Sequence, residues 1–163
     1  MAERIAVCPG SYDPVTNGHV DIISRAARVF DTVVVGVVGQ AIRKSNSMFT
    51  PEERKAFLEE ALSHLPNIRV EIFTNLVVDF AKDQQATVIV KGLRAISDFE
   101  YEFEMNQLNR KLAPEIESVY IIASPDYSFL SSTGVKEMAT FGGDVSDLVP
   151  SPVARALSER AAR

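Results

Sequence analysis

The stretch from Cys8 to His19, CPGSYDPVTNGH, holds the residues best suited to chemistry. An apolar segment over 5–8 precedes it and an amphipathic one over about 20–30 follows, which predicts a strand, a tight turn and a helix. Asn17 suits the helix start, where its side chain can accept from a free N–H. Unpaired N–H groups and the helix dipole favour an anion there, and Ser11 and His19 are best placed to reach it. The simpler interpretation is a tight turn with an exposed histidine.

Polar segments also follow three other apolar runs, which lie over 32–38, 87–90 and 118–123. These runs are rich in β-branched residues, which predicts buried strands of a parallel sheet. Ligands of such sheets bind beyond the carboxyl ends of the strands. We therefore expect one rim to be formed by residues 10–19, 39–47, 91–94 and 124–133.

This rim combines the groups that bind phosphates. Its cations are Arg43, Lys44, Lys91 and Arg94, and its hydroxyls belong to Ser11, Ser128, Ser131, Ser132 and Thr133. Cations, hydroxyls and unpaired helix N–H groups are all donors to phosphate oxygens. A single lysine at a loop tip is most simply a solvated residue, but four cations beside two helix starts favour a polyphosphate site.

Strands and helices alternate along the chain without an internal repeat or a linker. Thr50, Pro51 and Glu53 predict a capped helix that ends near His64, and Ser97 with Glu100 predicts a second capping box for a helix over 98–112. Another strand is expected over 68–73, and helices over 76–85, 131–141 and about 152–162. The pattern predicts one domain, residues 1–163, with a doubly wound, Rossmann-like α/β fold: a parallel sheet of about five strands with helices on both faces.

The composition restricts the class of protein. A chain of 163 residues with 46% hydrophobic residues supports one packed domain. The net charge of −5 argues against general attraction to nucleic acid. A single cysteine fits a reducing compartment. Because neither a signal peptide nor an apolar run of membrane-spanning length is evident, we expect a cytoplasmic protein without a membrane partner.

Several common sequence motifs for binding phosphate or metal are absent from the sequence. It has no P-loop, no G-x-G-x-x-G after the first strand and no Cys/His cluster for zinc. No pair of carboxylates is clearly placed for acid–base work; Asp13 and Glu102 are candidates for polar contacts only. The second histidine, His64, is expected at the surface. We therefore expect no protein-based metal site.

Three motifs together resemble a known family. The first, SYDPVTNGH over 11–19, is similar to the signature of the nucleotidylyltransferase superfamily. Residues 91–102, KGLRAISDFEYE, and 128–137, SFLSSTGVKE, narrow the resemblance to the bacterial phosphopantetheine adenylyltransferase family. The similarity extends from Val7 to about Pro150.

The resemblance implies that ATP, with Mg²⁺ held mainly by its phosphates, reacts with 4′-phosphopantetheine to give dephospho-coenzyme A and pyrophosphate, the penultimate step of coenzyme A synthesis. It implies that His19 stabilises the transition state, that Ser11 contacts the pantetheine phosphate, and that Lys91 and Lys44 hold this phosphate. Val77 would touch the pantetheine arm. The residues implied for ATP are Ser11, Tyr12, His19, Gly92, Leu93, Arg94, Glu102, Tyr127, Ser128, Phe129, Leu130, Ser131, Ser132 and Thr133.

The sequence departs from the family pattern in a few places. Tyr12 stands where Phe is usual, Lys91 where Arg is frequent and Thr133 where Ser is usual. The loop over 40–47 lacks the usual Pro-x-Lys spacing and is about two residues longer, so Arg43 is nearly as good a candidate as Lys44 for the phosphate.

Three other functions compete with this one: a nucleotidylyltransferase acting on nicotinate mononucleotide or glycerol phosphate, a non-catalytic nucleotide-binding regulator, and a flavodoxin-like electron carrier. The motifs over 91–102 and 128–137 argue against the first. The cationic rim and the low aromatic content of 8% argue against the last. The resemblance further implies a hexamer and feedback binding of coenzyme A.

Overall fold

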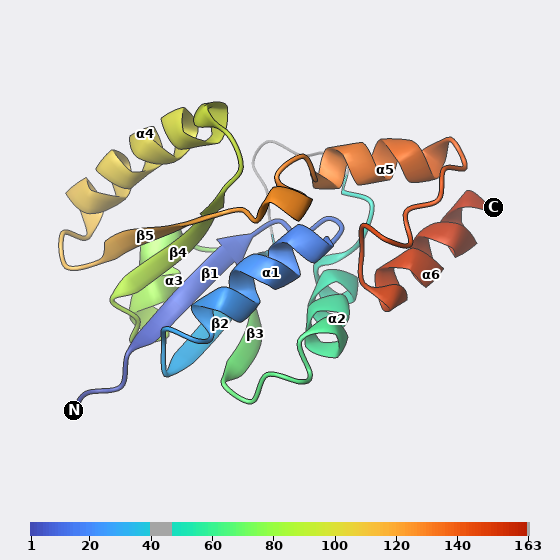
Figure 1. Cartoon of the computed structure of the whole chain (residues 1–163). Helices are drawn as coiled ribbons and strands as arrows, with labels where there is room; N and C mark the ends of the chain where they lie inside the picture. The colour runs from blue at the N-terminus through green and yellow to red at the C-terminus, as the bar shows by residue number, and fades with distance from the viewer. Residues whose placement is uncertain (40–46, 163) are drawn as a thin grey trace.

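The computed structural model describes residues 1–39 and 47–162 (Figure 1). These residues form one sheet with helices on both of its faces. The strands are β1 (Ile5–Gly10), β2 (Thr32–Val38), β3 (Ile68–Phe73), β4 (Val88–Leu93) and β5 (Glu117–Ile122). The helices are α1 (Asn17–Ala26), α2 (Pro51–Ala61), α3 (Val77–Asp83), α4 (Ile96–Leu112), the short 3₁₀ turn η1 (Pro125–Tyr127), α5 (Ser132–Thr140) and α6 (Ser151–Ala161).

The sheet is parallel throughout and has the strand order β3-β2-β1-β4-β5. The direction of winding reverses between β1 and β4, so a crevice opens at the carboxyl ends of these two strands. Strand β2, TVVVGVV, has five consecutive buried residues, as a strand covered on both faces requires. The prediction of a doubly wound α/β fold with five parallel strands is confirmed.

Helices pack on both faces of the sheet through separate apolar clusters. One cluster joins the sheet to α1, α2, α5 and α6. The other joins the opposite face to α3, mainly through Val78, Phe80 and Ala81. In Figure 1, α1 lies in front of the sheet and α3 lies behind it, so the helices hold the strand ends at the upper edge in place.

The first predicted capping box is confirmed. The hydroxyl of Thr50 accepts from the N–H of Glu53 at 3.2 Å, and the Glu53 carboxylate accepts from the N–H of Thr50 at 2.8 Å. Pro51 is the first helical residue, where its missing N–H costs no hydrogen bond. Arg160 of α6 binds the same carboxylate at 2.9 Å, which fastens α6 to the start of α2.

The second predicted capping box is wrong. Helix α4 begins at Ile96, after Ala95, and neither Ser97 nor Glu100 caps it. Instead Asp98 accepts from the N–H of Arg94 at 3.0 Å and also binds its guanidinium. The charged hydrogen bonds to Arg94 are stronger than a hydroxyl cap, and they close the turn between β4 and α4.

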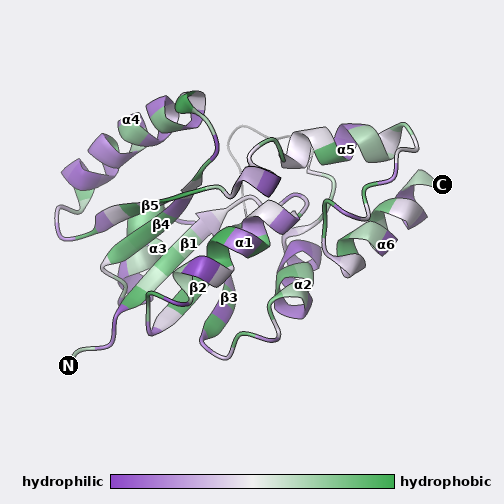
Figure 2. Ribbon diagram, in the orientation of Figure 1, coloured by the Kyte–Doolittle hydropathy of each residue, from purple (hydrophilic) through white to green (hydrophobic). Residues whose placement is uncertain are grey.

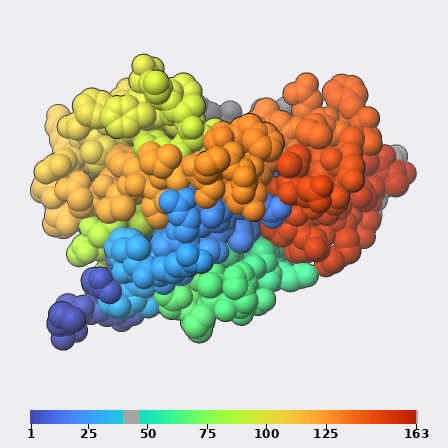
Figure 3. Space-filling model, viewed as in Figure 1, coloured from blue at the N-terminus to red at the C-terminus, as the bar shows by residue number. Residues whose placement is uncertain are grey.

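Strand β5 and helix α4 form the outer side of the molecule. The prediction of a buried strand over 118–123 is wrong, because β5 lies at the sheet edge and each of its residues is at least partly exposed. All residues of α4 are likewise at least partly exposed. Hydrophobic and hydrophilic positions intermix along α4 in Figure 2, and its side chains form a surface ridge in Figure 3. No helix among the described residues is long and apolar enough to cross a membrane.

Candidate active site

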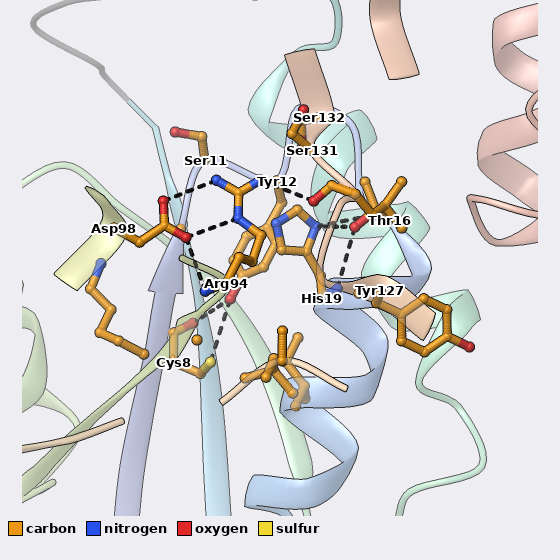
Figure 4. A pocket seen from close by; sticks show the side chains of 18 of the residues that line it. Cys8, Ser11, Tyr12, Thr16, His19, Arg94, Asp98, Tyr127, Ser131 and Ser132 are labelled. Carbon is orange, nitrogen blue, oxygen red and sulfur yellow. Dashed lines mark hydrogen bonds and ion pairs between the residues drawn. The ribbon is translucent and has the colours of Figure 1, made fainter. Parts of the chain in front are cut away.

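A cavity of about 510 Å³ lies at the carboxyl ends of β1 and β4, where the winding of the sheet reverses (Figure 4). The turn from β1 to α1 forms one wall, the turn from β4 to α4 a second, and the start of α5 a third. The prediction that the rim segments meet at one edge therefore holds for 10–19, 91–94 and 124–133. Residues 40–46, including the predicted phosphate ligand Lys44 and its alternative Arg43, lie outside the described residues.

Tyr12 gives the turn after β1 its shape. Its backbone has a positive φ of 51°, uncommon for a residue with a side chain. The buried ring compensates for this: its hydroxyl donates to the carbonyl of Cys8 at 2.8 Å, and the ring meets that of His19 edge to face, with centroids 5.0 Å apart. The tyrosine therefore holds both the turn and the imidazole.

Thr16, not Asn17, caps helix α1. The Thr16 hydroxyl accepts from the N–H of His19 at 3.3 Å, and the imidazole Nδ1 accepts from the N–H of Thr16 at 3.0 Å. Asn17 turns away and donates from its side chain to the carbonyl of Asp147. The N–H of Asn17 is also engaged, by the carbonyl of Leu148 at 2.9 Å. Fewer N–H groups of α1 are thus open to an anion than the sequence suggested.

His19 is held neutral with its remaining donor toward the cavity. Because Nδ1 accepts from Thr16, the proton of the neutral ring resides on Nε2. Burial of the ring, helped by the positive charge of Arg94, lowers the pKa of His19 to about 4. In Figure 4 the imidazole lies between Arg94 and Thr16. The geometry gives a fixed, uncharged N–H donor at physiological pH.

The N-terminus of α5 supplies further donors. The Ser131 hydroxyl caps the helix by accepting from the N–H of Gly134 at 3.0 Å, and the Ser132 hydroxyl donates to the carbonyl of Pro14 at 2.8 Å. The backbone N–H groups of Ser132 and Thr133 have no acceptor among the described residues. These two N–H groups make the end of α5 an anion-binding wall.

Arg94 spans the mouth of the cavity. Its guanidinium binds Asp98 through Nε and Nη2, at 3.1 and 3.2 Å, and donates from Nη1 to the carbonyl of Leu130 at 2.9 Å. Burial alone would raise the pKa of Asp98, but the bonds from Arg94 hold it below its ordinary value. The arginine therefore connects β4, α4 and the segment before α5 while its charge faces the cavity.

A second cavity of about 300 Å³ adjoins the first, beneath α4. Ser11 and Lys91 line both cavities, together with Tyr101 and Glu102. The Lys91 ammonium lies 3.4 Å from a carboxylate oxygen of Glu102. The part of the second cavity beyond the junction includes apolar and amide side chains, namely those of Val38, Val77, Ile89, Met105, Asn106 and Asn109.

Most predicted site residues line the first cavity. They are Ser11, Tyr12, His19, Lys91, Gly92, Arg94, Glu102, Tyr127, Leu130, Ser131, Ser132 and Thr133. Val77 lines the second cavity. Three others lie elsewhere: Leu93 is buried, the Ser128 hydroxyl donates to the carbonyl of Pro125, and Phe129 is 72% exposed. Their predicted ATP contacts remain predictions.

Sequence reasoning missed the capping role of Thr16 and the bond of Asp98 to Arg94, and it named Asp13 as a candidate for polar contacts without its partners. Asp13 is buried and accepts from the N–H groups of Met48 and Phe49 and from the Lys136 ammonium, at 2.9, 2.9 and 3.1 Å. The available signal was the motif TNGH, in which Thr precedes His by three residues, the spacing of a capping box. The partners of Asp13 are remote in sequence and left no such signal.

The described residues contain no group of three or more His, Cys, Asp or Glu side chains that could hold a metal ion. The cavity instead combines cations, hydroxyls and N–H groups, which bind phosphate oxygens. This donor set suits a phosphorylated ligand.

Comparison with known proteins identifies the class. Residues 7–138 match the family model described as cytidylyltransferase-like, which defines a nucleotidylyltransferase. A solved structure described as a nicotinate-nucleotide adenylyltransferase from Vibrio parahaemolyticus shares the fold, with a TM-score of 0.69 and 17% identity over 98% of this chain and 93% of that one.

Curated relatives narrow the class further. A phosphopantetheine adenylyltransferase from Thermomicrobium roseum is 49% identical over 98% of this chain and 96% of its own length. One from Bdellovibrio bacteriovorus is 52% identical over 96% of this chain and 97% of its own. The chain belongs to the phosphopantetheine adenylyltransferase family.

Proposed function

We propose that the protein transfers the adenylyl group of ATP to 4′-phosphopantetheine, giving dephospho-coenzyme A and pyrophosphate. The observation that carries this proposal is the pair of cavities that share Ser11 and Lys91. The larger, rich in phosphate donors, suits Mg-ATP. The smaller suits a slender acceptor with an apolar and amide arm. The acceptor phosphate and the α-phosphorus then meet where the cavities join.

The acceptor phosphate needs no general base, because its second pKa is about 6 and it is largely dianionic at neutral pH. One of its oxygens attacks the α-phosphorus, the new P–O bond forms, and the bond to the bridging oxygen breaks. Pyrophosphate leaves with that electron pair. Positioning and charge stabilisation supply the catalysis.

His19, Lys91 and the start of α5 have distinct roles in this proposal. The Nε2–H of His19 donates to a non-bridging oxygen of the α-phosphate as charge develops. Lys91 holds the acceptor phosphate, with Lys44 as the second cation. The N–H groups of Ser132 and Thr133 hold the phosphates of ATP, whose Mg²⁺ is bound mainly by those phosphates.

Two further properties belong to the proposal. Coenzyme A carries both a pantetheine arm and an adenylyl group, so we expect it to compete for the two cavities. Helix α4 carries large apolar side chains that are about half exposed, such as Phe99 (49%), Phe103 (54%) and Leu108 (50%). Covering them is favourable, and we expect a hexamer in which α4 contacts another copy.

The test is pyrophosphate release by the purified protein with Mg-ATP, with and without 4′-phosphopantetheine. We expect release only with the acceptor, and dephospho-coenzyme A in equal amount. Nicotinate mononucleotide and glycerol phosphate serve as alternative acceptors. Turnover with one of these and not with phosphopantetheine would reject the proposed substrate, and ATP binding without any turnover would indicate a regulator.

A further inference from the structure

Arg54 is a buried cation behind the turn that carries Ser11. The residue is only 4% exposed and lies in the first turn of α2. Among the described residues, its guanidinium binds carbonyl groups and no carboxylate. The carboxylates of Asp13 and Glu52 favour this charge through space, but a cation near a helix N-terminus opposes the helix dipole. The helix dipole therefore gives no reason for an arginine at this position.

The four carbonyl groups that Arg54 binds lie at the active-site edge of the fold. Nε donates to the carbonyls of Phe49 and Thr50 at 3.2 and 3.3 Å, just before α2. Nη1 donates to the carbonyls of Ser11 at 2.5 Å and Val38 at 3.1 Å. Ser11 directly follows β1 and Val38 is the last residue of the adjacent strand β2, and both line the second cavity. One side chain thus fixes two strand ends at the junction of the cavities.

The bond to Ser11 also orients the next N–H group. In a trans peptide the carbonyl and the N–H point in opposite directions. Since the carbonyl of Ser11 points to Arg54, the N–H of Tyr12 points away from Arg54. It has no acceptor among the described residues, and Tyr12 lines the first cavity. A charged donor on the carbonyl polarises the peptide and strengthens its N–H as a donor.

We propose that Arg54 is a positioning residue for adenylyl transfer: it fixes the Ser11–Tyr12 peptide so that the N–H of Tyr12 and the hydroxyl of Ser11 meet the transferred phosphate. This role rests on the proposed function, because it concerns the same phosphate. Asp13 also braces the turn, through Met48, Phe49 and Lys136, so we expect the turn to persist without Arg54 while its orientation changes.

The first experiment compares Arg54→Met, Arg54→Lys and a matched control, Arg160→Met. Arg160 stacks on the Phe49 ring at 4.5 Å and binds Glu53, so its loss loosens the same helix start without touching Ser11. For Arg54→Met we expect kcat to fall by about 10- to 100-fold, because a small misplacement of the reacting groups causes a rate loss of this order. We expect the KM for ATP to stay within about threefold of wild type, because the other ATP contacts remain. Arg54→Lys keeps the positive charge but loses the planar set of N–H donors, so we expect its kcat to lie between those of Arg54→Met and the wild type.

The second experiment follows the amide signal of Tyr12 in protein labelled with ¹⁵N-tyrosine. The chain has four tyrosines, and Tyr12→Phe assigns the signal. We expect Mg-ATP to shift this signal in the wild type and in Arg160→Met, but not in Arg54→Met. This readout needs no turnover, so it tests Arg54 even if phosphopantetheine is not the acceptor.

The outcomes separate the two proposals. If the wild type is inactive with phosphopantetheine, the proposed acceptor is rejected. The shift of the Tyr12 amide signal with Mg-ATP still tests the role of Arg54 in that case. Two results with an active wild type would overturn the role of Arg54. One is a kcat of Arg54→Met equal to that of the Arg160→Met control. The other is a Tyr12 amide signal that Mg-ATP shifts in Arg54→Met as much as in the wild type. If Arg54→Met does not fold, Arg54→Lys decides: a wild-type kcat overturns the role and a several-fold loss supports it.

Discussion

The backbone N–H of Thr16 donates to Nδ1 of His19 over 3.0 Å, and the same residue caps helix α1 with its hydroxyl. One capping box therefore starts the helix and selects the tautomer of the imidazole. A proton on Nδ1 would face the N–H of Thr16, so this bond favours the proton on Nε2. The helix start and the proposed donor to phosphate are one structural unit.

The first prediction concerns the protonation of His19. Because its pKa is lowered to about 4, we expect a neutral Nε2–H ring throughout pH 5–8. Long-range ¹H–¹⁵N spectra of histidine-labelled protein measure this directly, and His64→Gln assigns the two histidines. A midpoint near 6.5 for His19, or a proton on Nδ1 at pH 7, would contradict the prediction. Since the unfolded ring titrates near 6.5, its contribution to stability is complete above that pH and is lost as pH falls toward 4.

The second prediction concerns the contribution of His19 to the rate. We expect His19→Ala to lower kcat by about 10²–10³, the usual effect of losing one donor to the transition state, with little change in folding. Thermal melting and steady-state kinetics measure the two effects. His19→Gln should retain more activity than His19→Asn, because the longer amide approximates the position of Nε2. A near-normal rate for His19→Ala, or an unfolded variant, would reject this role.

The third prediction concerns the phosphate ligand within 40–46. We expect Lys44→Ala to raise the KM for phosphopantetheine about tenfold or more while changing the KM for ATP little, because a lost charged contact to phosphate costs about 1.5–3 kcal/mol. Arg43→Ala is the matched control. The reverse order of effects would assign the phosphate to Arg43.

The fourth prediction concerns the brace behind the turn. Burial would raise the pKa of Asp13, but two N–H groups and Lys136 hold it below its ordinary value. Asp13→Asn should lower the free energy of unfolding by about 3 kcal/mol at pH 7, because Lys136 loses its partner. This stabilisation is present above the unfolded carboxyl pKa of about 3.9 and is lost as pH falls through the lower folded value.

Denaturant unfolding at pH 7 and pH 3 measures this difference between wild type and Asp13→Asn. The double variant with Lys136→Met should lose less than the sum of the two single variants, since each removes the same ion pair. Additive losses would show that Asp13 and Lys136 act separately.

The fifth prediction concerns the surface of α4. We expect Phe103→Arg together with Leu108→Arg to shift the protein from the proposed hexamer toward monomer, because both side chains are about half exposed and charge opposes their burial. Sedimentation velocity measures the change. Val29, which is 54% exposed in the turn after α1, gives a matched control as Val29→Arg. An unchanged sedimentation coefficient for the α4 variant would exclude this surface.

The sequence by itself determined the order of the elements, the parallel sheet and most of the cavity lining. Apolar runs such as TVVVGVV specify buried strands, and the capping box at Thr50 and Glu53 is local, so neighbouring residues suffice to predict it. The rim residues followed because parallel strands present their carboxyl ends at one edge.

Tertiary structure alone decided the partners of the charged side chains and the exposure of the outer elements. Asp13 binds Lys136 across 123 positions, β5 lies at the edge, and Arg54 reaches Ser11 across 43 positions of the chain. Local spacing carries no record of such contacts, because they depend on which strands become neighbours. The sequence placed His19 at the site, and the folded turn decided its tautomer and charge.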